Sequence, residues 1–234
     1  MLYYLQNQLK KYKTMLKFKN SIKQIRFFLN NKLFLVGLII KLGFGAVFAS
    51  EYLTELFVPF VNYFLENPLN NPYQHFITIN EKVFPYPPLM LYIMAGINAI
   101  FSPLLSWLPL PDPNILIFRM PMLIADVVIL YVLCRISPKY NNQLIVMYWL
   151  NPILIYISYI HGQLDVIPIA FLLLSTYFFY KEKLIVSAVL FGLGCATKTH
   201  LLIILPLFLL TIPVSQNRLK NSVTYLAITG TTLF

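Results

Sequence analysis

The polar residues that suggest chemistry most strongly lie in one short segment, His161-Gly162-Gln163-Leu164-Asp165, between two apolar runs. A plain tight turn would explain Gly162 and Asp165, but hardly His161 and Gln163 as well. Polar side chains between long apolar segments are costly and often functional. We therefore predict that His161, Gln163 and Asp165 bind a substrate.

Basic residues inside apolar runs form the second group of candidates. Lys198 and His200 stand between two half-length apolar runs, where Lys198 is poorly placed to anchor a helix at an interface. Lys41 interrupts the first long apolar segment, where it either extends to an interface, pairs with a neighbour or meets a lipid phosphate. Lys198, His200 and Lys41 are candidate phosphate ligands.

Arg119 and Asp126 are seven residues apart, which places them two helical turns apart on one face. One interpretation is a structural charge pair with neighbouring helices. The alternative is that Arg119 grips a diphosphate through its fork of donors and Asp126 contacts the substrate. The sequence leaves both open.

Two carboxylates follow the first apolar segment directly. Glu51 and Glu55 are one helical turn apart, so they share a face at the membrane surface. A carboxylate there could act as general base for an acceptor hydroxyl. The alternative is a solvated polar face without chemistry.

The composition indicates that membrane helices position these residues. Of the 234 residues, 59% are hydrophobic and only 11% are charged, and the mean hydropathy is +0.71. A soluble domain is nearer 45–50% apolar and ~25% charged. The two cysteines form no CxxC or Cys/His cluster, so the sequence supports neither a disulfide framework nor a zinc site. We assign no metal ligand and no certain cofactor, and leave a divalent metal open.

The net charge of +10 comes largely from the beginning of the chain. Eight of the eighteen basic residues lie in positions 1–32, which contain no acidic residue, and an apolar segment follows. This pattern places the N-terminus in the cytoplasm and argues against nucleic-acid binding. A cleaved signal peptide is the weaker alternative, because the basic region is long and Lys41 interrupts the apolar stretch.

We predict an all-α, polytopic transmembrane bundle of about 7–8 hydrophobic segments. Residues 1–32 form a basic cytoplasmic segment, and residues 33–234 form a single transmembrane domain that looks truncated, since the chain ends inside an apolar run. Several segments are shorter than the ~20 residues that a span needs, so broken or tilted helices are expected. The segments are 33–50, 88–108, 115–134, 144–160, 166–180, 184–197, 201–214 and 223–234.

The longest polar connection, residues 51–84, is predicted to be extracytoplasmic. Its first part has apolar residues at helical spacing, typical of a helix in the membrane interface, and its Asn- and Pro-rich second part should be irregular. If every apolar segment crosses the membrane from a cytoplasmic N-terminus, the basic residues of the later loops lie outside. The positive-inside rule places the same residues inside. We resolve the conflict by supposing that residues 88–108 do not cross fully, which puts residues 161–165 and Lys198 on the side of the long loop.

The ordered set of segments resembles the GT-C glycosyltransferases, and most closely their bacterial mannosyltransferase-like branch. The likeness covers residues 33–210 and rests on FPYPPLMLYI, RMPMLIADVVILYVL, NPILIYISYIHGQLD and ATKTHLLIILPL. It implies an integral enzyme of the bacterial inner membrane that moves a hexose, with mannose as the first candidate, from a polyprenyl-phosphate-linked donor to a glycan or lipid acceptor.

The resemblance also implies roles for individual residues. The family places an acidic residue, usually Asp, after the first helix as base, and this chain has Glu51 there. Lys198 matches the family lysine that neutralises the lipid phosphate, and Lys41 lies where a basic residue is common. Rival interpretations are a transporter or flippase, a polysaccharide polymerase or ligase of the O-antigen kind, and a structural membrane subunit.

Overall fold

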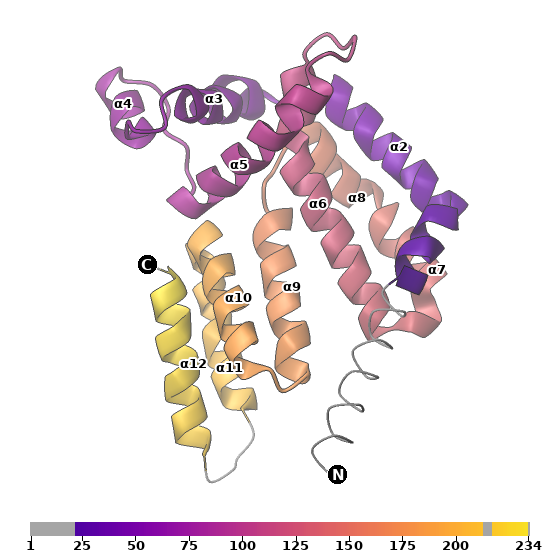
Figure 1. Ribbon diagram of the computed structural model, residues 1–234, viewed down its shortest axis with the longest axis vertical. Coiled ribbons are helices and arrows are strands. Elements are labelled where there is room, and N and C mark those ends of the chain that lie inside the picture. The colour runs from indigo at the N-terminus through magenta and orange to yellow at the C-terminus, as the bar shows by residue number, and fades with distance from the viewer. Residues whose placement is uncertain (1–21, 213–216, 234) are drawn as a thin grey trace, which may run out of the picture. The chain divides into compact units, whose positions relative to one another are not determined.

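The computed structural model describes residues 22–212 and 217–233, and throughout these ranges its regular elements are helices, with no strand (Figure 1). The predicted all-α class is confirmed. The chain divides into two compact units, Met1–Ile40 and Lys41–Phe234. Most of the predicted basic segment, residues 1–21, lies outside the described residues, and the predicted domain boundary at residue 32 stays a prediction.

The described part of the first unit consists of a helix over Ile22–Asn30 and the beginning of α2, Lys32–Val47, with a bend of 73° between the two helices. Asn31 causes the break. Its side-chain oxygen accepts hydrogen bonds from the backbone N–H groups of Leu33 and Phe34, at 3.0 and 3.1 Å. Such a cap satisfies donors that have no partner inside the new helix.

Prolines mark many helix starts in the second unit. Proline lacks an N–H and has a fixed φ, so it fits the first turn of a helix. The elements are η1 (Tyr52–Phe57), α3 (Val58–Glu66), α4 (Pro72–Thr78), α5 (Pro88–Leu105), α6 (Pro113–Ile136), η2 (Pro138–Tyr140), α7 (Asn141–Leu144), η3 (Ile145–Trp149), α8 (Pro152–Ile155), η4 (Tyr156–His161), α9 (Val166–Tyr180), α10 (Leu184–Thr197), η5 (Thr199–Ile204), α11 (Leu205–Thr211) and α12 (Arg218–Leu233).

Two described helices, α5 and α6, are long and apolar enough to cross a membrane, and up to four spans result if each bent helix pair counts as one. The predicted number of 7–8 spans is not confirmed, because α9, α10 and the helix over Thr199–Thr211 are shorter than a span. Despite Pro103, α5 is one continuous helix of 18 residues. That residues 88–108 do not cross the membrane fully stays a prediction.

The connection between α2 and α5 is largely helical. The predicted amphipathic helix exists as η1 and α3, and its apolar face is covered by protein. Its position in the membrane interface stays a prediction. Its buried residues Leu53, Leu56, Phe57, Phe60 and Val61 belong to a core that also contains Phe76, Phe84, Tyr86 and Met90.

The Asn- and Pro-rich part of the same connection is more regular than predicted. The Asn71 side chain accepts a hydrogen bond from the Gln74 N–H at 3.3 Å, and Pro72 occupies the first turn, so the pair starts the short helix α4. An Asn–Pro pair can therefore begin a helix where the sequence suggested only a loop.

A second core joins α9, α10, α11 and α12, which run side by side in Figure 1. Gly192 permits the close approach of α10 and α12, since a Cβ there would lie 1.7 Å from Thr232 Oγ1 and 2.8 Å from the Thr229 carbonyl oxygen. Buried hydroxyl groups satisfy one another in this core: Ser175 donates to the Ser187 carbonyl at 2.8 Å, and Tyr225 lies 3.2 Å from Ser187 Oγ.

Candidate active site

Arg119 of α6 fixes the two backbone segments that lead into the candidate site. It is fully buried, and its guanidinium donates to the main-chain oxygens of Ser158, Phe48 (3.0 Å) and Ile160 (3.4 Å). Carbonyl groups at helix ends lack partners within their own helix. One side chain therefore satisfies acceptors at the end of α2 and in η4, and it holds these chain segments together.

Gly162 leaves room for this guanidinium. Its φ is +90°, and a Cβ would lie 2.8 Å from Leu53 Cδ1 and 3.2 Å from Arg119 Nη1. Just beyond, Ser50 Oγ donates to the His161 carbonyl at 2.5 Å. The beginning of the long connection, where Glu51 stands, is therefore joined to the segment 161–165.

Lys41 and Asp126 form an ion pair in the interior of the second unit. Lys41 is fully buried, and its ammonium contacts Asp126 Oδ2. Asp126 also accepts from the hydroxyl groups of Tyr159 at 2.9 Å and Tyr148 at 2.5 Å. The Lys41 nitrogen lies 4.0 Å from the centroid of the Trp149 ring.

Two π-helical turns supply these aromatic partners. The Leu150 N–H bonds to the Ile145 carbonyl, and the Gly162 N–H bonds to the Ile157 carbonyl, both five residues apart and both at 2.9 Å. π-Helical turns are rare and are frequent at functional sites. Here they turn side chains of η3 and η4 toward Asp126.

Lys198 and Asp165 form a second ion pair, nearer the surface. Their side chains are 25% and 41% exposed. Lys198 lies in extended backbone between α10 and η5, and its nitrogen is 5.7 Å from the centroid of the Tyr86 ring. The structure thus joins the predicted segment 161–165 to the predicted phosphate ligand.

Tyr86, a neighbour of Lys198, and Tyr73, which contacts Tyr86, were not singled out by the sequence reasoning. Burial, reinforced by the negative charge of Asp165, raises the pKa of Tyr86 to about 12, so its phenol stays protonated at neutral pH. The Tyr73 hydroxyl donates to the Tyr86 carbonyl at 2.7 Å. The Pro-Tyr-Pro-Pro run could have indicated Tyr86 from the sequence, because flanking prolines restrict the backbone that carries the ring.

The other predicted residues are placed as follows. Glu51 and Glu55 are exposed and form no ion pair with a described residue. His161 lies between the rings of Tyr52 and Tyr156, and its Nε2 is 3.5 Å from Gln163 Nε2. His200 is exposed on η5, away from these contacts.

The candidate residues therefore separate into two groups. The first group lies nearer the surface: His161 contacts Gln163, Asp165 of the same segment pairs with Lys198, and Glu51 follows Ser50, which bonds to the His161 carbonyl. Lys41, Arg119 and Asp126 are buried and already hold internal partners, so a phosphate or sugar reaching any of them would have to displace one. Their roles as ligands stay predictions.

Two neighbouring pockets share Pro88 and Tyr92 in their linings, and Ala196 and Thr199, close to Lys198 in sequence, line the first. The first, which we call the apolar groove, has a volume of about 560 Å³. It is lined by Pro87, Pro88, Leu89, Tyr92, Leu193, Ala196, Thr199, Leu202, Thr232 and Leu233. The second, which we call the polar pocket, has a volume of about 330 Å³ and is lined by Phe64, Pro68, Leu69, Asn70, Asn71, Pro72, Tyr73, Pro88, Leu91 and Tyr92.

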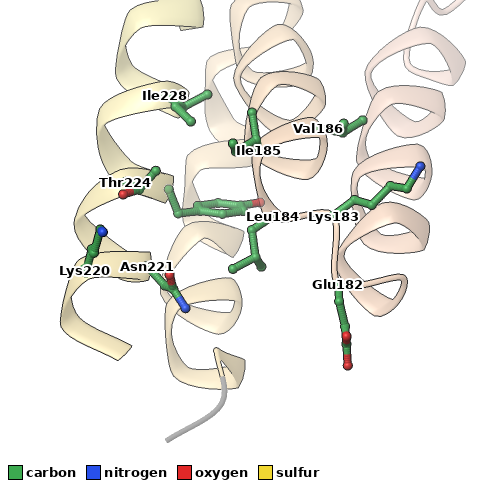
Figure 2. Close-up of a pocket in the computed structure, with 10 residues that line it drawn as sticks. Glu182, Lys183, Leu184, Ile185, Val186, Lys220, Asn221, Thr224 and Ile228 are labelled. Carbon is green, nitrogen blue, oxygen red and sulfur yellow. The ribbon is translucent and has the colours of Figure 1, made fainter. Parts of the chain in front are cut away.

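A third pocket of about 480 Å³ lies between the turn after α9 and α12. Figure 2 shows Leu184, Ile185 and Ile228 around it, while Lys183 and Glu182 point away. Helix α10 has 14 residues, and at a rise of 1.5 Å per residue it is about 20 Å long. The third pocket lies at the start of this helix, and Lys198 follows its end. It is too far away to be part of the candidate site.

No group of three His, Cys, Asp or Glu side chains that could hold a metal ion occurs within residues 22–212 and 217–233. The candidate site as described is built from one carboxylate–ammonium pair, neighbouring aromatic rings and an exposed glutamate.

Comparison with known proteins gives one match. No curated protein and no solved structure matches the chain. Residues 78–214 match a family described as alpha-(1->6)-mannopyranosyltransferase, N-terminal domain. The match contains α5, α6, the segment 161–165 and Lys198, but not Glu51. Because it covers more than half of the 234 residues, the chain belongs to this mannosyltransferase family.

Proposed function

We propose that the protein is a multi-pass membrane glycosyltransferase, with a cytoplasmic N-terminus, that moves a mannose from a polyprenyl-phosphate donor to a glycan or lipid acceptor at the outer face. The observation that carries this proposal is Lys198, a partly exposed cation whose neighbours in sequence, Ala196 and Thr199, line the apolar groove. Family membership supports the sugar, and the apolar helices support the membrane.

The groove and the cation suit the two halves of such a donor. Ala196 and Thr199, which flank Lys198 in sequence, line the groove, and so does Pro87, which follows Tyr86. A polyprenyl chain in the groove would bring its phosphate to the Lys198 ammonium. A cation beside a leaving phosphate stabilises the charge that develops as the sugar–oxygen bond breaks.

Asp165 holds Lys198 until the donor arrives. Its carboxylate occupies the position that a phosphate oxygen would take on the ammonium. When the phosphate replaces it, Asp165 becomes free to accept a hydrogen bond from a sugar hydroxyl. His161 and Gln163 lie in the same segment and can contribute to sugar binding.

Glu51 is the general base of this proposal. Its carboxylate is exposed and makes no ion pair with a described residue, and the Ser50–His161 hydrogen bond keeps its backbone next to the sugar-binding segment. In the reaction, the acceptor oxygen forms a bond to the anomeric carbon while the bond to the phosphate oxygen breaks. The acceptor proton passes to Glu51.

Two matched pairs of variants in the full-length protein test this function. We expect Glu51→Gln to reduce mannose transfer by about 10²–10⁴-fold, because the amide cannot accept the proton. Glu55→Gln, one turn further on, should keep its activity. Lys198→Met should raise the donor KM strongly, whereas Lys183→Met, at the other end of α10, should not.

The assay follows labelled mannose from polyprenyl-phosphate-mannose into an acceptor glycan, in membranes with matched protein levels. Full activity of Glu51→Gln would exclude Glu51 as the base. Full activity of both Glu51→Gln and Lys198→Met would overturn the proposed function.

A further inference from the structure

We propose that the polar pocket binds a saccharide, and that this saccharide is the end of the acceptor glycan. The first statement rests on the pocket itself. The second rests also on the proposed function. The pocket lies between α5 and the segment that joins α3 to α4.

The lining of the pocket combines the two kinds of groups that recognise sugars. Aromatic rings from Phe64, Tyr73 and Tyr92 offer flat faces to sugar C–H groups, and Asn70 and Asn71 offer amides. A planar amide both donates and accepts hydrogen bonds, as a sugar hydroxyl does. The volume of about 330 Å³ is at the lower end of the range for small-molecule sites.

Several hydrogen-bonding groups in the pocket are available for a ligand. The Asn70 amide and the Tyr92 hydroxyl form no side-chain hydrogen bond with a described residue. Asn71 uses its oxygen to cap α4, which fixes its rotamer and leaves its N–H₂ donors free for a ligand. The Phe64 ring, 5.6 Å from the Tyr92 ring, helps to hold that tyrosine in place.

Contacts lead from this pocket to Lys198. Tyr73 lines the pocket and donates to the Tyr86 carbonyl, and the Tyr86 ring lies against the Lys198 ammonium. Pro88 and Tyr92 line both the polar pocket and the apolar groove. An acceptor in the polar pocket and a donor in the apolar groove would therefore meet beside Lys198.

The chemistry of the polar pocket does not fit a lipid chain. If an apolar chain covered the exposed amides of its wall, these amides would lose their hydrogen bonds to water without replacement, which costs free energy. A sugar hydroxyl would replace those hydrogen bonds. The apolar groove next to it offers a lipid chain a better site. In this proposal the polar pocket binds the acceptor saccharide, and the apolar groove binds the lipid chain of the donor.

Two conservative variants of the full-length protein test the inference. Asn70→Ala removes the free amide, and Tyr92→Phe removes one hydroxyl while keeping the ring in the apolar groove. A hydrogen bond contributes ~1 kcal/mol, so each variant should raise the acceptor KM by about fivefold, with kcat and the donor KM within about twofold of wild type. The controls are Gln74→Ala, on the exposed surface of α4, and Tyr180→Phe, at the far end of α9.

Direct binding separates this inference from the proposed function. Saturation-transfer NMR with α-(1→6)-mannobiose, on protein in lipid nanodiscs, needs no catalysis. A mannobiose affinity that is about fivefold weaker in both variants but unchanged in both controls, measured by titration of this signal, would support the pocket even if the wild type transfers no mannose. Transfer with an unchanged acceptor KM in both variants would overturn the pocket and leave the proposed function intact, and a wild type without any mannobiose signal would also overturn it.

Discussion

Replacing Asp126 by asparagine should strongly destabilise the fold, because it removes the negative partner of a fully buried lysine. Lys41 has no exposed surface, and Asp126 is its one ion-pair partner among the described residues. Asparagine has nearly the same shape but keeps one acceptor oxygen, so only one of Tyr148 and Tyr159 can still donate to it, and the other hydroxyl must turn to accept from the new amide N–H₂ group. The variant therefore removes the charge and exchanges one acceptor for a donor.

The expected cost follows from the burial of the pair. Removing one partner of a buried ion pair typically costs 3–5 kcal/mol. The Trp149 ring, 4.0 Å from the Lys41 nitrogen, remains in the variant and offsets part of this cost. We expect the free energy of unfolding to fall by ~3 kcal/mol, which lowers the folding equilibrium constant by a factor on the order of 100.

The double variant Lys41→Met/Asp126→Asn is the control. It has no charge at positions 41 and 126, and replacing a buried pair by neutral groups is often nearly neutral. It should therefore be more stable than Asp126→Asn alone and within about 1.5 kcal/mol of wild type.

Tryptophan fluorescence during unfolding in mixed micelles provides the measurement. The protein has two tryptophans, of which Trp149 is fully buried beside Lys41 and Trp107 is 73% exposed. A Trp107→Phe background therefore isolates the signal at the ion pair. If Asp126→Asn unfolds like wild type and the double variant is the least stable, the reasoning is refuted.

Two further predictions concern packing and topology. Gly192→Ala should lower the free energy of unfolding by ~1–3 kcal/mol in thermal or chemical unfolding, because its Cβ would overlap Thr232 of α12. Gly230→Ala, with no atom within 4 Å of the added Cβ, should be neutral or gain up to ~1 kcal/mol, and equal losses in both variants would contradict the account. In a membrane-sidedness assay, Asn70→Cys and Gln163→Cys should react with an impermeant maleimide from the same side, with little background because both native cysteines are buried. Reaction from opposite sides would separate the long connection from the segment 161–165 and contradict the predicted topology.

Composition and helical spacing were sufficient to predict the helical class, because they follow from local chemistry. The apolar spacing of residues 53–64 correctly indicated a helix. It could not indicate what would cover that helix, since lipid and protein both accept an apolar face. The structure covers it with Phe76, Phe84 and other core residues from later in the chain.

The sequence was sufficient to select individual candidate residues, but it did not predict which residues they contact. Spacing placed Arg119 and Asp126 on one helix face, and both are indeed buried. Their partners come from other elements: Asp126 pairs with Lys41, 85 residues away, and Arg119 binds main-chain oxygens. A sequence shows that a buried charge needs a partner, but the packing of the helices decides which one.

The π-helical turns at Ile145–Trp149 and Tyr156–His161 make the protein sensitive to length as well as to composition. A π turn holds one residue more than the α turn it replaces. Deleting a single residue there would restore an ordinary α-helical register and rotate the following side chains by about 100° around the helix axis. Tyr148 and Tyr159 would then turn away from Asp126, although every residue of the buried cluster would still be encoded. A gene that preserved each of these residue types could still lose the cluster through one missing codon.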